Sequence, residues 1–111
     1  ADFANSGRLD LYVSTCATGK VGVQAMPSML FRNDGRGKFA DVSKESGACP
    51  PGYLGRGAAL LDFDGDGLLD LVVCEQYYSS KVKTGPALYR NKGGHKFESA
   101  SAAAGLPAGF G

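Results

Sequence analysis

The segment Asp62-Phe-Asp-Gly-Asp-Gly-Leu-Leu-Asp70 constrains the fold of this chain more than any other feature of its sequence. Its carboxylates stand close together and repel one another unless a cation lies between them. Calcium takes about six to eight hard oxygen ligands at roughly 2.3–2.6 Å, and the two glycines of the segment permit the positive φ that a tight loop needs. We therefore predict one bound calcium ion, with these ligands: Asp62, Asp64, Asp66, the backbone carbonyl of Leu68, and Asp70.

This calcium loop does not follow the EF-hand pattern. An EF-hand requires a bidentate Glu at the twelfth loop position, but that position is Val73 when the count starts at Asp62. The closing carboxylate is Asp70, at position nine. Residues 57–61 and 71–74 flank the loop as short apolar runs, which predict strands rather than helices. The alternative to a calcium loop is a Gly/Asp-rich turn that binds no ion. Such a turn needs only one or two glycine or aspartate residues, whereas this segment has four carboxylates.

The chain also contains an internal repeat. Residues 2–13 align with residues 62–73 at an offset of 60 positions, and residues 30–39 align with residues 88–97 at an offset of 58 positions. A repeat of this length indicates an architecture built from one supersecondary unit used several times.

The repeat divides the chain into two units. Gly47 and Gly105 close them at equivalent positions. We expect residues 1–47 to form a partial unit that lacks its innermost strand. Residues 48–111 are expected to form a second unit with the complete calcium loop and the start of the link to a following unit.

The second unit contains four strand-like pieces, at residues 57–61, 69–75, 87–91 and 96–100. Residues 91–95 and their counterpart 33–37 are rich in residues that tolerate positive φ, and we expect a hairpin turn at each. Residues 43–46 and 101–104 are each expected to form a helical turn. Four antiparallel strands about every 60 residues are typical of a β-propeller blade. The predicted fold class is all-β: a partial propeller of about two blades, with the calcium loop between the first and second strands of a blade.

These motifs resemble the FG-GAP/VCBS repeat family. The resemblance is carried by the Asp-x-Asp-x-Asp-Gly-x-x-Asp loop, the Gly55-Arg-Gly-Ala-Ala lead-in and the Leu-Tyr/Phe-Arg-Asn hairpins. The loop is similar to the calcium loops of integrin α-subunits, and the chain more closely resembles the cartilage acidic protein family, although it shows no ASPIC/UnbV segment. The resemblance implies a calcium-stabilised, non-catalytic propeller that serves adhesion or recognition. It also implies an extracellular or cell-surface location, or the periplasm in a bacterium.

The first unit departs from the motif. Its loop offers Asp2, Ser6 and Asp10, and Ala4 replaces another carboxylate. Because ligand charge is a main determinant of calcium affinity, we expect this degenerate loop to bind calcium weakly or not at all.

The chain is too short to form a closed propeller by itself. A propeller closes with about four to eight blades, whereas this chain holds about one and three-quarters. Isolated blades leave open strand edges and uncovered apolar faces. We therefore expect a segment of a longer protein, covered by the remaining blades of that protein or by neighbouring copies.

Charge and cysteine content exclude several classes of function. The net charge of +1 argues against nucleic-acid binding, and no apolar run approaches the roughly 18 residues of a membrane span. The three cysteines have no zinc-site spacing. Cys74 is expected to be a small buried apolar residue on a strand, and Cys16 and Cys49 lie in loops where a disulfide is open as an alternative.

The residues do not indicate an enzyme. Ser14, His95 and the aspartates form no recognisable triad, so the alternative is a segment of a propeller hydrolase or lyase whose catalytic site lies outside this chain. One long loop offers candidate contacts for a protein or glycan partner: Tyr77, Tyr78, Lys81 and Lys83. A merely solvated loop is the favoured interpretation of these residues.

Overall fold

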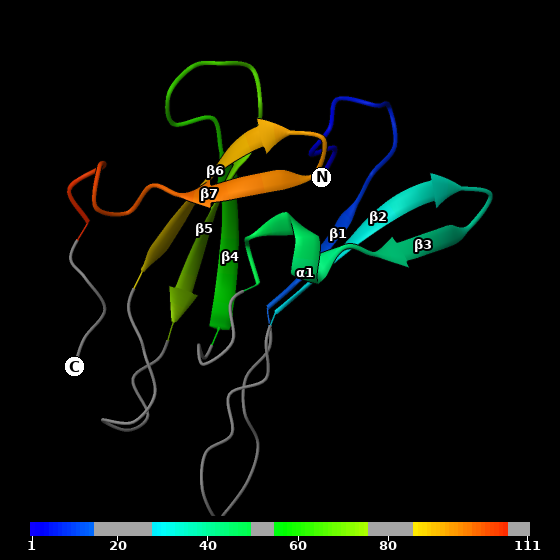
Figure 1. Cartoon of the computed structure of the whole chain (residues 1–111), viewed down its shortest axis with the longest axis horizontal. Coiled ribbons are helices and arrows are strands. Elements are labelled where there is room, and N and C mark those ends of the chain that lie inside the picture. Colours follow the sequence, from blue (N-terminus) through cyan, green and yellow to red (C-terminus); the bar gives the residue numbers. More distant parts are fainter. Residues whose placement is uncertain (15–27, 50–54, 76–85, 107–111) are drawn as a thin grey trace, which may run out of the picture.

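The computed structural model describes residues 1–14, 28–49, 55–75 and 86–106 (Figure 1). Its elements, in chain order, are β1 (Leu11–Val13), β2 (Met29–Gly35), β3 (Lys38–Asp41), α1 (Ser43–Ser46), β4 (Gly55–Leu61), β5 (Asp70–Glu75), β6 (Ala87–Gly93) and β7 (Lys96–Ser99). The strands build two antiparallel sheets, one in the order β1-β2-β3 and one in the order β4-β5-β6-β7. The prediction of an all-β partial propeller with two blades is thus confirmed.

The two sheets follow the sequence repeat. Strands β1, β2 and β3 correspond to β5, β6 and β7, and within the described residues β4 has no counterpart in the first sheet. Strand β4 begins two residues earlier than predicted, because its pairing with β5 continues through a bulge between Gly55 and Gly57. The acidic segment lies where it was expected, between the first and second strands of the second sheet.

Each sheet ends in a tight two-residue hairpin turn. The turn residues, whose φ angles lie between 58° and 75°, are Arg36 and Gly37 in the first sheet and Gly94 and His95 in the second. Positive φ at both central residues is the type I′ geometry, whose twist matches that of the flanking strands. The turn residues predicted from the sequence are confirmed.

A short helix separates the sheets. Helix α1 contacts β2 and β7 and lies between the two sheets (Figure 1). In the second unit the corresponding residues form a single hydrogen-bonded turn, in which the Ala104 amide donates to the Ala100 carbonyl at 3.0 Å. Both helical turns expected from the sequence are therefore present in outline. Among the described residues, no helix is long and apolar enough to cross a membrane.

The apolar core lies between the two units. Phe3 and Leu30 of the first unit, together with Ala48 at the start of the second, are buried against strands β5, β6 and β7. The rings of Phe3 and Phe97 meet edge to face, with centroids 5.5 Å apart and an interplanar angle of 80°, which is a favourable aromatic geometry. The hydroxyl of Tyr12 donates to the Ala48 carbonyl at 2.9 Å. The units therefore stabilise each other by burying one shared interface.

One prediction about the core was wrong. Cys74 lies on β5 as expected, but its side chain is exposed rather than buried. Side chains alternate across a strand, and Val73 points to the face that packs on the first unit, so Cys74 points to the opposite face, which no described element covers. Cys49 is a free, half-buried thiol whose pKa is raised by burial. Cys16, its suggested disulfide partner, lies outside the described residues.

Gly47 marks a close approach between the units and supplies a test of their packing. It ends α1 with φ of 79°, and a Cβ added there would lie 2.6 Å from the backbone oxygen of Phe97. We expect Gly47→Ala to lower the free energy of unfolding by about 2 kcal/mol or more, because it adds this clash to the cost of a left-handed backbone. Urea unfolding at equilibrium measures the change.

Gly105 is the matched control for this substitution. It has almost the same φ, 80°, but a Cβ at this position would meet nothing within 4 Å. Gly105→Ala should therefore cost only about 1 kcal/mol, the backbone contribution alone. Equal losses for the two variants would contradict the close packing of α1 against β7.

Candidate metal centre

Four carboxylates converge in the loop between β4 and β5. Ligand oxygens of Asp62, Asp64, Asp66 and Asp70 all lie within 4.8 Å of one another. Strand β4 ends just before Asp62, and Asp70 opens β5, so the ends of two paired strands anchor the two ends of the loop. The structure thus brings together all four side chains that the sequence predicted as ligands.

Two of these carboxylates also shape the loop. Asp62 accepts hydrogen bonds from the backbone amides of Asp66 at 3.1 Å and Gly67 at 2.8 Å. Asp70 is fully buried and accepts from the amides of Phe63 at 3.1 Å and Asn91 at 2.7 Å. Asp70 therefore ties the start of the loop to strand β6.

The charges of the cluster are only partly compensated. The hydrogen bond from the Gly67 amide lowers the pKa of the Asp62 carboxyl. Loss of hydration raises the pKa of the Asp64 carboxyl, and the charges of Asp66 and Asp70 add to this shift. The upward shift persists even though the Nε of Arg90 lies 2.9 Å from Asp64 Oδ2. The single guanidinium of Arg90 therefore does not remove the mutual repulsion among the four carboxylates.

The donor set fits a hard divalent cation. Every side chain in the cluster offers carboxylate oxygens, and none offers nitrogen or sulfur, which is the chemistry that calcium and magnesium select over zinc or copper. The oxygens that already accept an amide hydrogen keep further lone pairs, because a carboxylate has about four acceptor sites. The residues present therefore fit an ion of this class.

The loop of the first unit has the same shape without the same charge. Asp2 accepts from the amides of Ser6 at 2.9 Å and Gly7 at 2.7 Å, as Asp62 does from Asp66 and Gly67. Buried Asp10 accepts from the amides of Phe3 at 3.2 Å and Asn33 at 2.9 Å. The loop conformation therefore survives the loss of two carboxylates, because backbone amides hold it.

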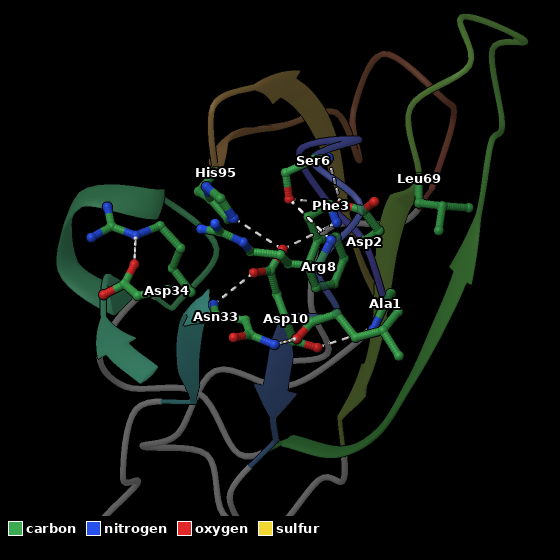
Figure 2. Close-up of polar contacts among 12 residues, drawn as sticks. Ala1, Asp2, Phe3, Ser6, Arg8, Asp10, Asn33, Asp34, Leu69 and His95 are labelled. Carbon is green, nitrogen blue, oxygen red and sulfur yellow. Dashed lines mark hydrogen bonds and ion pairs between the residues drawn. The ribbon is translucent and has the colours of Figure 1, made fainter. Parts of the chain in front are cut away.

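Basic side chains surround this degenerate loop. Nε2 of His95, from the hairpin of the second unit, lies 2.9 Å from Asp10 Oδ2, and Figure 2 shows the two side chains pointing toward each other. Arg8 stands where the second loop has Leu68, and its guanidinium packs against Gly35. The first loop thus has two fewer acids than the second and has Arg8 and His95 as neighbours, so fewer like charges remain for an ion to compensate.

Each unit has an arginine at the same repeat position, and the two arginines pair with carboxylates at different places. In the second unit Arg90 pairs with Asp64 of the loop. In the first unit the equivalent residue is Arg32, and Ala4 stands at the repeat position of Asp64. The Nε of Arg32 pairs instead with Asp34 of its own hairpin at 2.7 Å. The hydrogen bond to Arg32 lowers the pKa of the Asp34 carboxyl. Each arginine therefore pairs with a carboxylate of its own unit.

Sequence reasoning missed two residues that join the units. The Nδ2 of Asn91 donates to the carbonyls of Phe3 at 2.7 Å and Leu69 at 2.9 Å, and His95 contacts Asp10. The one signal for Asn91 was the recurrence of Asn at the same place in both hairpins. The expected partner-contact residues lie outside the described residues: Tyr77, Tyr78, Lys81 and Lys83.

Comparisons with known proteins agree with this architecture. The family model described as an FG-GAP-like repeat matches residues 2–73. Cartilage acidic protein 1 is 46% identical over 46 residues in both Mus musculus and Homo sapiens, and 44% identical over 46 residues in Xenopus tropicalis. Each match covers 41% of this chain and 7% of the relative, so the chain spans only a small part of these proteins. No solved structure matches the chain.

Proposed function

This chain belongs to the FG-GAP-like repeat family, and on that premise we propose that it is a calcium-binding segment of a larger extracellular β-propeller that serves recognition or adhesion. Its two repeat units are residues 1–47 and 48–111. The role of the ion is structural rather than catalytic.

The observation that carries this proposal is the contrast between the two loops. They share one backbone design, but only the second gathers four carboxylates within 4.8 Å. Such a concentration of like charge destabilises a loop unless a cation compensates it. We propose that the ion is held by the four carboxylates together with the carbonyl of Leu68, and that Asp2, Ser6 and Asp10 of the degenerate loop hold none.

Calcium at this position would act as a clamp. It would neutralise the repulsion between the end of β4 and the start of β5. Through Asp70, which accepts from the Asn91 amide, it would also secure the loop to β6. The chemistry supplied is therefore charge compensation at the junction of three strands.

The proposal includes an extracellular location for the protein. Calcium modules of extracellular proteins commonly bind with Kd values of about 10⁻⁴–10⁻³ M, a range that suits a loop in which the ligands are largely exposed. The name of the matched relatives refers to cartilage, which supports the same location. We propose a protein or glycan as the recognised partner, with the loop that carries Tyr77, Tyr78, Lys81 and Lys83 as the contact.

Calorimetric titration with calcium tests the site. We expect one ion per chain, and we expect Asp64→Asn to weaken binding by about tenfold or more, because ligand charge sets affinity. This variant keeps the side-chain size and touches no backbone amide closer than 3.4 Å, so the loop should keep its shape.

Asp34→Asn is the matched control for the titration. It also removes one arginine-paired, exposed carboxylate, but from the hairpin of the first unit. Its calcium affinity should equal that of the wild type. The proposal fails if the wild type takes up no calcium at millimolar concentration, and a stoichiometry of two ions would refute the assignment of the first loop.

A further inference from the structure

The degenerate loop of the first unit contacts the acidic loop of the second. Nδ2 of the exposed Asn5 side chain donates to the backbone carbonyl of Gly67 at 3.4 Å, across 62 positions of the chain. Asn5 belongs to the degenerate loop, and Gly67 directly follows the proposed ligand Asp66. The degenerate loop is therefore a direct neighbour of the proposed calcium site.

Asn5 stands where the second loop has a glycine. Its repeat equivalent is Gly65, and the φ angles of both are positive, 52° for Asn5 and 73° for Gly65. Asparagine is one of the few residues with a Cβ that adopt this left-handed conformation readily. The first loop therefore keeps the backbone turn of the second loop and gains an amide side chain, which reaches the other unit.

The peptide group that accepts from Asn5 also binds a proposed calcium ligand. This group joins Gly67 to Leu68. Its carbonyl accepts from Asn5, and its N–H, which belongs to Leu68, donates to Asp66 Oδ1 at 2.9 Å. Hydrogen bonds at the two ends of one peptide group strengthen each other by polarisation. The contact with Asn5 therefore helps to fix the orientation of this peptide group and of the Asp66 carboxylate.

The carbonyl of Leu69, on the other side of Leu68, is held in a similar way. It accepts from Asn91 Nδ2 at 2.9 Å, and the same amide donates to the carbonyl of Phe3 in the first unit at 2.7 Å. Within the described part of the chain, no hydrogen bond reaches the carbonyl of Leu68 itself. The proposed ligand is therefore an unpaired carbonyl between two carbonyls that side-chain amides hold in place.

The degenerate loop is itself fixed against the second unit. Phe3, two residues before Asn5, is 1% exposed, and its ring packs edge to face on Phe97. The Phe3 amide donates to buried Asp10, whose Oδ2 also lies 2.9 Å from Nε2 of His95. Contacts with the hairpin of the second unit thus hold the loop that carries Asn5, so its amide has a rigid base from which to act.

We propose that Asn5 is a positioning residue for the calcium site of the second unit. By binding the peptide group after Gly67, it orients the backbone at Leu68 so that the Leu68 carbonyl can serve as a ligand. The degenerate loop therefore contributes to calcium binding without holding an ion itself. This inference rests on the proposed function, because it concerns the same site, and it makes the calcium affinity of one unit depend on the unit before it.

Calorimetric titration of Asn5→Gly with calcium, in the full 111-residue chain, tests the proposal. Glycine accepts the positive φ and removes the amide, and the position is exposed, so the variant should fold. Melting in chelator checks that the calcium-free fold is intact. We expect the Kd for calcium to rise about threefold, because one exposed, neutral hydrogen bond is lost.

Ser6→Ala is the matched control in the same loop. The Ser6 hydroxyl bonds to Asp2 and to the Arg8 amide, both within the degenerate loop, so the Kd of this variant should equal that of the wild type. An unchanged Kd for Asn5→Gly overturns the proposal, and so does an equal rise in the Kd of both variants.

Nuclear magnetic resonance in chelator tests the contact without an ion. The nitrogen chemical shift of an amide responds to a hydrogen bond accepted by the carbonyl of the same peptide group. Asn5→Gly should therefore shift the Leu68 amide resonance, whereas Ser6→Ala should leave it in place. A Leu68 resonance that Asn5→Gly does not move overturns the proposal, whatever the chain binds.

The two measurements distinguish failure of this inference from failure of the proposed function. If the wild type takes up no calcium, the proposed function fails, and the positioning role fails with it. If the wild type binds calcium and Asn5→Gly binds it equally well, only the positioning role fails.

Discussion

Chelation of calcium is expected to lower the melting temperature of this chain by roughly 10 °C or more, and Asp66→Ala is expected to abolish most of that response. An ion that binds only the folded state stabilises it by about 2.7 kcal/mol at a hundredfold excess over its Kd. Each kcal/mol shifts the melting temperature of a domain of this size by roughly 4–8 °C. Differential scanning calorimetry with calcium and with chelator measures both shifts.

Ser6→Ala is the control for this experiment. Ser6 is the repeat equivalent of Asp66, and its exposed hydroxyl accepts from the Arg8 amide at 3.3 Å and donates to Asp2 Oδ1 at 3.4 Å. The variant should therefore melt close to the wild type and respond to chelator in the same way. A wild-type melting curve that chelator leaves unchanged would refute a structural role for calcium.

Asn91→Ala is expected to lower the free energy of unfolding by about 3 kcal/mol. The Asn91 side chain is 1% exposed and donates to the carbonyls of both Phe3 and Leu69, and its Oδ1 accepts from the Gly93 amide at 2.8 Å. Alanine would leave the buried Phe3 carbonyl and the half-buried Leu69 carbonyl and Gly93 amide without these partners, and each unsatisfied buried group costs about 1–3 kcal/mol. Urea unfolding at equilibrium measures the loss.

Asn33→Ala separates the local role of this asparagine from its role between units. Asn33 makes the equivalent bonds within its own unit, to the Leu9 carbonyl at 3.0 Å and from the Gly35 amide at 2.8 Å. It is only half-buried, so water can replace its bonds, and we expect a loss of about 1 kcal/mol. Similar losses for the two variants would show that the bond to Phe3 contributes little.

Local sequence pattern was sufficient to predict the blades and the acidic cluster. Positions 62–70 bring their carboxylates together because a short loop between paired strands has few other places to put them. The hairpin turns were predictable because each turn segment contains glycines, which adopt positive φ most readily, and Arg36 and His95 take the remaining positive-φ positions. Because the two units align, the elements predicted in one unit could also be predicted in the other.

The burial of Cys74 could not be predicted in the same way. Alternation along β5 shows that Val73 and Cys74 point to opposite faces, but it does not show which face another unit covers. The structure places the first unit against Val73, which is 3% exposed, and leaves Cys74 exposed. A strand pattern therefore determines the two sets of side chains without determining which set forms the core.

By itself, the sequence determined the repeat, the strand–loop–strand order and the identity of the acidic side chains, because each depends on residues close together in the chain. Only the tertiary structure decided how the units meet. Asn91 reaches Phe3 across 88 positions and His95 reaches Asp10 across 85, and no local periodicity relates residues so far apart. Those contacts arise because burying the apolar face of one sheet on the next brings the hairpin of one unit against the loop of its neighbour.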